Sequence, residues 1–182
     1  MIYVPDLSLE MDLGYPEIYQ YIKEFWIFSL FIILIIKSKN GAYSVWSFLF
    51  LFFLLDDAIS LHENFGYFFA ESFNVQSAFG LRPNDIGEML YFVSIGTIVL
   101  LLLILFYKFS NDRFRYHSIN IFSLLLILVF FGFIVDMLHI ILNINYRVNQ
   151  FIGTIEDGGE MVVMSLILGY VYLLNIRDYG SE

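Results

Sequence analysis

The feature that most constrains this chain is the placement of acidic and histidine residues at the ends of long apolar stretches. Two of these stretches run into such residues, and two others begin with them. The residues are Asp56, Asp57, His62 and Glu63 after the first stretch, Glu88 before the second, Asp136 and His139 after the third, and Glu156, Asp157 and Glu160 before the fourth. Ionisable side chains inside a bilayer are rare and costly, so by default they indicate a functional site.

The composition is that of a membrane protein. The chain has 182 residues, of which 59% are hydrophobic and only 15% are charged. A helix of about 20 residues crosses a bilayer core of about 30 Å. Five segments can do so: 19–36, 43–69, 86–107, 119–142 and 151–176. The sequence therefore predicts an all-α, polytopic membrane helix bundle of about five transmembrane helices, with a four-helix core plus the first helix.

Most of the apolar runs are shorter than the bilayer is thick, which bears on the depth of the polar residues; the run 89–107 is the exception and nearly spans alone. The run Ala42–Leu55 covers only about 21 Å of helix at about 1.5 Å per residue, so Asp56 and Asp57 must enter the membrane to complete the span. The first segment crosses only if the charged end of Lys23 extends toward the interface. The same shortfall draws in the polar ends of the other helices: Asp136, His139, Glu156 and Glu160.

The basic residues predict an orientation. Six lie on one side of the expected bundle and three on the other, and the richer side is cytoplasmic by the positive-inside rule. The six are Lys37, Lys39, Lys108, Arg113, Arg115 and Arg177. This assignment makes residues 1–18 an acidic extracytoplasmic segment, 19–176 the transmembrane bundle, and 177–182 a short cytoplasmic tail. The polar cluster then faces the extracytoplasmic leaflet.

Charge and cysteine content exclude several functions. The net charge of -9 would repel nucleic acid, and no basic stripe is present to bind phosphates. The chain has no cysteine, so disulfides, thiolate metal sites and cysteine nucleophiles are excluded. The expected partners are the lipid bilayer, a lipid-soluble substrate and other subunits of a membrane complex.

An up-and-down bundle brings the polar residues together, because the ends of segments two and four lie beside the starts of three and five. Residues three or four apart share a helix face. Segment two, read as one continuous helix, places Asp56, Ser60 and Glu63 on one face. Asp57 and His62 then point elsewhere. The other pairs that share a face are Asp136 with His139 and Glu156 with Glu160.

The charges on this side of the bundle do not balance. Seven carboxyl groups near the site meet only three basic residues, Lys23, Arg82 and Arg147, all expected at interfaces or in loops. Placing a carboxylate at the centre of a membrane helix costs roughly 2.5–3.5 kcal/mol. Three basic residues cannot form salt bridges with all seven carboxyl groups, so most of this cost is left uncompensated. Bound protons or metal ions must offset the charge.

Histidine beside carboxylates favours a transition metal. Asp136 and His139 resemble the Glu-x-x-His motif of di-iron and di-manganese bundles, in which two other helices each provide one Glu. Imidazole with oxygen ligands suits iron, manganese, zinc or copper better than calcium, and the metal's identity stays open. The candidate metal ligands are Asp56, His62, Glu63, Glu88, Asp136, His139, Glu156 and Glu160.

Two short stretches carry a resemblance to a known group of proteins. The stretch 55–63, with its acid pair followed by His62 and Glu63, resembles a signature of uncharacterised bacterial multi-pass membrane proteins. The stretch 155–161 is similar to the acidic motif in their last helix. The resemblance implies that these residues matter, and it implies no particular activity.

These patterns predict a membrane metalloenzyme, an oxidoreductase or hydrolase that acts on a lipid-soluble substrate. A haem b held between His62 and His139 is an alternative cofactor. A proton- or cation-coupled transporter component is a second function, although the few polar residues in the opposite halves of the helices favour the enzyme. A non-catalytic subunit of a larger membrane complex is the third.

Some of these residues also have purely structural interpretations. His62 and His139 could each form only a hydrogen bond to a neighbouring helix. His117 is expected to be solvated in a cytoplasmic loop, without an assigned role. Gly158 and Gly159 are expected to permit close approach of another helix.

Overall fold

The computed structural model describes residues 14–78, 80–138 and 146–177. Its helices are α1 (Tyr15–Ser38), α2 (Ser44–Ile59), α3 (Leu61–Ser72), α4 (Pro83–Phe109), α5 (Asp112–Val129) and α7 (Tyr146–Arg177). A short 3-10 turn, η2 (Gly41–Tyr43), precedes α2, and a π-helical segment, η3 (Phe130–Val135), continues α5. The described residues contain no strand, which confirms the predicted all-α class.

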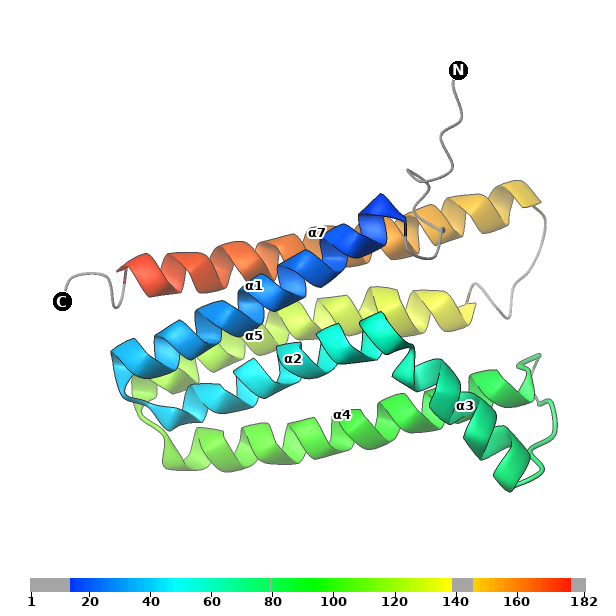
Figure 1. The fold of residues 1–182 in the computed structure, drawn as a ribbon, viewed down its shortest axis with the longest axis horizontal. Helices are drawn as coiled ribbons and strands as arrows, with labels where there is room; N and C mark the ends of the chain where they lie inside the picture. Colours follow the sequence, from blue (N-terminus) through cyan, green and yellow to red (C-terminus); the bar gives the residue numbers. More distant parts are fainter. Residues whose placement is uncertain (1–13, 79, 139–145, 178–182) are drawn as a thin grey trace, which may run out of the picture.

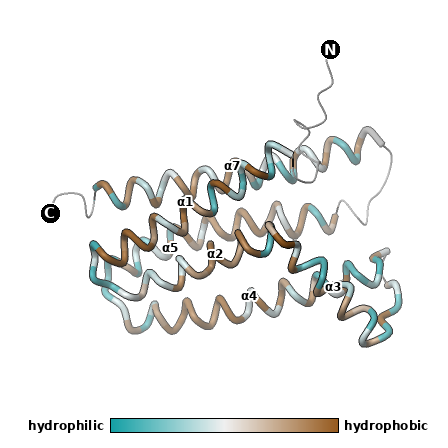
Figure 2. Tube along the Cα trace, in the orientation of Figure 1, coloured by the Kyte–Doolittle hydropathy of each residue, from teal (hydrophilic) through white to brown (hydrophobic). Residues whose placement is uncertain are grey.

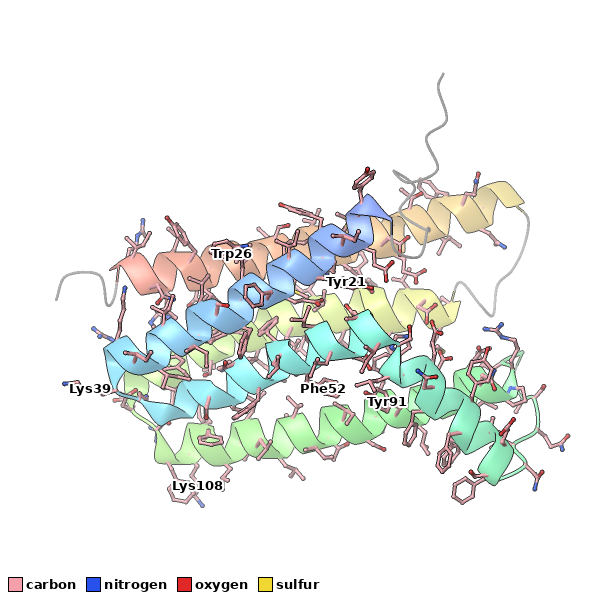
Figure 3. The ribbon with its side chains drawn as sticks, viewed as in Figure 1. Tyr21, Trp26, Lys39, Phe52, Tyr91 and Lys108 are labelled. Atoms are coloured by element: carbon pink, nitrogen blue, oxygen red, sulfur yellow. The ribbon has the colours of Figure 1, made fainter. Side chains whose placement is uncertain are left out.

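The long helices α1, α2, α4, α5 and α7 run side by side, and α3 crosses the first turns of α4 (Figure 1). The end of α2 and the starts of α1, α4 and α7 lie at the same end of this bundle, as predicted from the up-and-down order. Lys39 and Lys108 lie at the opposite end (Figure 3). The acidic and basic ends of the bundle are therefore separate, whereas the side of the membrane that each one faces stays a prediction.

Within the described part of the chain, four helices are long and apolar enough to cross a membrane: Gly41–Ile59, Pro83–Phe109, Asp112–Leu138 and Val148–Arg177. These spans make the chain an integral membrane protein, with the lipid bilayer as its surroundings. The helix α1 has 24 residues and about 36 Å of length, enough to run beside them.

The predicted second segment is not one continuous helix. The helix α2 ends at Ile59, and Ser60 adopts a left-handed conformation with φ 46°. The chain changes direction there and begins α3 at once. Because the helix phase is broken at Ser60, the prediction that Asp56, Ser60 and Glu63 form one stripe is wrong.

The core lies between α1, α2, α5 and α7, so the first helix is central rather than peripheral. Ile27 and Phe31 of α1 have no exposed surface, and Phe31 stacks on Trp46 and Phe50 of α2 with ring centroids 6.5 and 5.9 Å apart. Ile167 of α7 is equally buried. Tight interior packing of this kind strongly disfavours added or removed volume.

The helix α4 is peripheral, and most of its surface is apolar and exposed (Figure 2). Its buried side chains along the membrane-spanning part include Tyr91 and Leu103. An apolar surface of this kind faces hydrocarbon without cost in a bilayer, so lipid accounts for the outward side of α4.

Two glycines hold α3 against α4. A Cβ on Gly87 would lie 2.6 Å from the carbonyl oxygen of Gly66, and one on Gly66 would lie 2.9 Å from the oxygen of Asn84. The backbones therefore approach as closely as they do only because neither position has a side chain. The start of α4 is fixed by Asp85, which has no exposed surface and accepts hydrogen bonds from the backbone and guanidinium of Arg82 at 2.7–3.2 Å.

We expect Gly87→Ala to lower the free energy of unfolding by about 1–3 kcal/mol, because the added methyl group forces α3 away from α4. Gly96→Ala is the matched control in the same helix, because a Cβ there meets nothing within 4 Å. It should be neutral or stabilising by up to about 1 kcal/mol. Reversible unfolding of the purified protein in mixed micelles measures both values, and equal effects would contradict the close contact.

Candidate functional site

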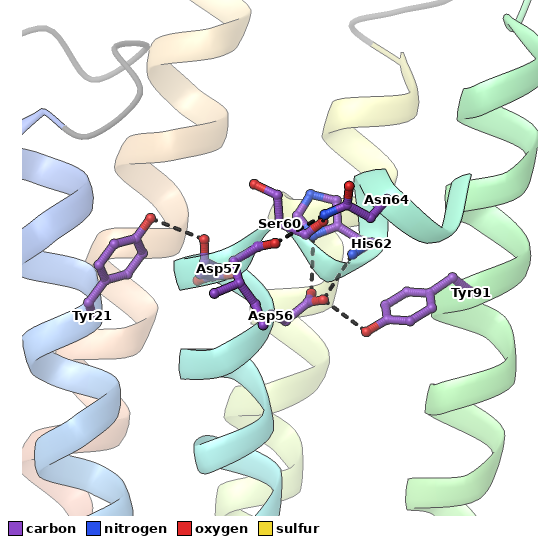
Figure 4. Close-up of polar contacts among 8 residues, drawn as sticks. Tyr21, Asp56, Asp57, Ser60, His62, Asn64 and Tyr91 are labelled. Atoms are coloured by element: carbon purple, nitrogen blue, oxygen red, sulfur yellow. Dashed lines mark hydrogen bonds and ion pairs between the residues drawn. The ribbon is translucent and has the colours of Figure 1, made fainter. Parts of the chain in front are cut away.

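Two consecutive acids at the end of α2 point to different sides of that helix (Figure 4). Asp56 points toward α3 and α4, where it meets His62 and Tyr91. Asp57 lies on the side of α1, where the hydroxyl of Tyr21 donates to its backbone oxygen at 3.2 Å. Neighbouring residues of a helix lie about 100° apart, so one turn of α2 serves two separate polar clusters.

Asp56 is the centre of the first cluster, and its side chain is almost completely buried. Its Oδ1 accepts hydrogen bonds from the backbone N–H of His62 at 3.1 Å and from the hydroxyl of Tyr91 at 2.9 Å. Its Oδ2 lies 3.2 Å from Nδ1 of His62. The backbone contact satisfies one of the free N–H groups at the start of α3. One carboxylate thus joins three helices, α2, α3 and α4.

His62 connects this cluster to the surface, because 26% of its side chain is exposed. Burial on its own lowers the pKa of His62, but the hydrogen bond and negative charge of Asp56 raise it. Glu88 and Asp57 add to this effect, and the pKa ends above the ordinary value of 6.5. When Nδ1 of His62 carries a proton it donates to Asp56, and Nε2 is then the second ring nitrogen available for chemistry.

Asp57 belongs to a second cluster, between α1, α2 and α7. Its carboxyl group is in hydrogen-bonding contact with Glu24, which is only 1% exposed. Lys23 is also 1% exposed, and its Nζ donates to the backbone oxygen of Met161 at 2.9 Å. The prediction that Lys23 extends to the interface is therefore wrong, because α7 provides a carbonyl acceptor inside the bundle.

Glu160 reaches the second cluster from α7, and its charge acts on Glu24 and Asp57. Its carboxyl group lies against Gly132 of η3, where a Cβ would meet Oε1 of Glu160. Gly159 allows close packing as predicted, since the ring of Phe131 covers it, whereas a Cβ on Gly158 would meet nothing within 4 Å. The π-helical segment thus provides the room for the Glu160 carboxyl group.

The remaining predicted site residues lie at different distances from these clusters. Glu88 acts electrostatically on His62, and its side chain packs against Gly66. Asp136 acts electrostatically on Glu88 and on Glu160, so its charge reaches both clusters. Glu156 is half-buried and Glu63 is exposed. His139 lies outside the described residues.

The described residues contain no group of three or more histidine and acidic side chains placed to hold a metal ion. Both the predicted ligand set and the alternative haem site include His139, which lies outside the described residues. Metal binding therefore stays a prediction. The geometry of the described residues is that of hydrogen-bonded acids rather than of a formed coordination sphere.

Sequence reasoning missed three residues of these clusters: Glu24, Lys23 and Tyr91. Glu24 and Lys23 precede the apolar run of α1 and therefore looked like residues of the membrane surface. The signal that identifies them is the spacing from Gln20 to Ile27, since these positions recur on the face that α1 buries. Tyr91 gives no comparable signal, because α4 is apolar all round.

A third polar group lies at the opposite end of the bundle. His117 is 8% exposed, and its Nδ1 lies 2.8 Å from the hydroxyl of Tyr170. Nε1 of Trp46 donates to Ser118 at 2.9 Å. The prediction that His117 is solvated is wrong, because the helix α5 begins at Asp112 and carries this residue into the bundle.

The pH dependence of stability should report the pairing of His62 with Asp56. A pKa raised in the folded state stabilises the protein fully below about pH 6.5, and this contribution is lost as the pH rises through the folded-state pKa. The stability advantage of the wild type over His62→Gln should therefore be largest at mildly acidic pH and shrink toward alkaline pH. Chemical unfolding at a series of pH values measures it, and an advantage that grows with pH would refute the pairing.

A family described as "Domain of unknown function (DUF8692)" matches residues 22–174. The comparison with curated proteins gave no match, and neither did the comparison with solved structures. The matched range includes both acidic clusters and all of the membrane spans except the last turn of α7. The chain therefore belongs to the DUF8692 family, whose function is unknown.

Proposed function

We propose that this integral membrane protein takes up and releases protons through the Asp56 cluster and acts as a proton-coupled component of a membrane transport system. The observation that carries the proposal is the contact of buried Asp56 with the partly exposed His62, at 3.2 Å between Oδ2 and Nδ1. A proton bound at Nδ1 can pass along this hydrogen bond to Oδ2, while the electron pair of the N–H bond stays on the imidazole.

The protonation of His62 provides the coupling. Asp56 binds both the side chain and the backbone N–H of His62, and it also binds Tyr91 of α4. Charging the imidazole strengthens its bond to the carboxylate, and transfer of the proton to Asp56 weakens the carboxylate as an acceptor. The proton therefore changes how firmly α3 and α4 are held to the end of α2.

Proton access is from one end of the bundle. Beyond the acidic clusters the core includes a layer of apolar side chains with no exposed surface, among them Ile27, Phe31, Phe50, Ile121 and Ile167. A continuous path of proton carriers does not pass through such a layer. This supports one-sided uptake linked to a conformational change, or to a partner subunit, rather than a proton channel.

Proton uptake by the purified protein tests the first step. Between neutral and mildly acidic pH the wild type should take up about one proton at His62. Asp56→Asn should move this uptake to lower pH, because the imidazolium loses its anionic partner. Asp112→Asn is the control, since the side chain of Asp112 is 99% exposed at the opposite end and should leave the curve unchanged. Potentiometric titration in micelles records the curves, and identical wild-type and Asp56→Asn curves would contradict the proposal.

Hydrogen–deuterium exchange tests the coupling. Acidification to the range where His62 is charged should increase protection of the α3 amides, residues 61–72, in the wild type. Asp56→Asn should abolish this response, while Asp112→Asn retains it. A pH response of α3 that persists in Asp56→Asn would mean that the cluster does not couple protonation to structure.

Elemental analysis separates this function from the predicted metalloenzyme. The proton proposal expects no stoichiometric transition metal in the purified protein. Iron, manganese, zinc or copper that is lost in His62→Ala but kept in His117→Ala would overturn it in favour of the metal site. His117 is a suitable control, because it is a buried histidine at the other end of the bundle.

A further inference from the structure

The second cluster contains two carboxyl groups in direct contact. Glu24 of α1 and Asp57 of α2 are in hydrogen-bonding contact, and both side chains come from helices that pack against each other. We propose that Glu24 and Asp57 form a proton-binding site that holds one proton between the two carboxyl groups. This pair lies on a different side of α2 from the Asp56 cluster.

The contact requires a bound proton, because two carboxylates are both acceptors. No hydrogen-bond donor reaches Oε1 or Oε2 of Glu24, and both atoms are buried. If both groups were ionised, the fully buried carboxylate of Glu24 would face the negative charge of the half-buried Asp57, and no donor would contact the Glu24 oxygens. A single proton converts this repulsion into a charge-assisted hydrogen bond, which is among the stronger kinds.

Gln20 is a second buried acceptor beside Glu24 that no donor contacts. It lies one turn before Glu24 on the same face of α1, and it is only 9% exposed. Its Oε1 is buried without a hydrogen-bond partner, like the two oxygens of Glu24. Three acceptor oxygens on one helix face are therefore buried in a region where no N–H or O–H group contacts them. A bound proton is what the region lacks.

The surrounding charges do not remove this need. Lys23 is the basic side chain that acts on Glu24, and it also acts on Glu160, so one positive charge is shared between two acids. Further titratable groups act on members of the cluster, and all but His62 add negative charge or none: Glu17, Tyr21, Asp56, His62, Asp136, Glu156 and Asp157. One proton on the pair halves its charge and leaves Lys23 to compensate Glu160.

A proton fits this site better than a metal cation. The described acids do not come together in a group of three that could hold a metal ion. Two facing carboxyl groups with one hydrogen between them need no further ligand. Both proposals involve bound protons, and this is the only respect in which the second site rests on the proposed function. Different residues form the two sites.

Infrared spectroscopy of the purified protein tests the pair at neutral pH. A protonated carboxyl group gives a C=O band separate from that of carboxylates, and the band shifts in D2O. We expect this band in the wild type and its loss in Glu24→Gln and in Asp57→Asn. Glu71→Gln should keep it, because Glu71 is an exposed acid of α3.

Glu24→Gln should remain folded, because its amide can donate to Asp57 in place of the shared proton. Helix content by circular dichroism checks this. Should the variant not fold, the wild type alone still decides, because absence of the band at neutral pH overturns the proposal. Survival of the band in folded Glu24→Gln overturns it too, as does a stoichiometric metal ion that this variant loses.

The two proposals can fail separately. Asp56→Asn should keep the infrared band of the Glu24–Asp57 pair while moving the proton uptake of His62. Loss of the band with normal uptake at His62 would remove only the second site. Normal infrared behaviour with an unchanged uptake curve in Asp56→Asn would remove only the proposed function.

Discussion

A carboxyl group that leaves water must find a hydrogen-bond donor, a cation or a proton, and this requirement organises one end of the bundle. Asp56 meets it with a tyrosine hydroxyl, a histidine ring and a backbone N–H. Asp57 has no comparable donors and meets Glu24 instead. The two adjacent acids therefore differ in their hydrogen bonds. Asp56 has its donors within its own cluster, whereas the Glu24–Asp57 pair needs a bound proton.

Apolar composition and run length were sufficient to predict the helical class and the gathering of acids at one end. They could not predict the break at Ser60, because its left-handed backbone occurs at a residue that carries no glycine or proline signal. The sequence spacing therefore placed Asp56 and His62 apart, whereas the structure brings them into contact. Tertiary packing rather than local propensity decides such a break.

The position of the first helix shows a second limit of sequence reasoning. Charged residues near the start of an apolar run normally indicate the membrane surface, and Lys23 was assigned there. A backbone oxygen of α7 accepts its proton instead, and Glu24 packs against another acid. Contacts between residues more than 100 positions apart, such as Lys23 with Met161, leave no periodic trace in a single sequence.

Gly87 and Tyr91 of α4 lie one helical turn apart on the same face. Since the rest of this helix is apolar on every side, hydrophobic patterning does not determine its rotation about its own axis. The close backbone contact of Gly87 with α3 and the hydrogen bond from the Tyr91 hydroxyl to Asp56 together determine this rotation. The polar end of the protein thus fixes the rotation of α4 about its long axis, which contact with lipid alone would leave undetermined.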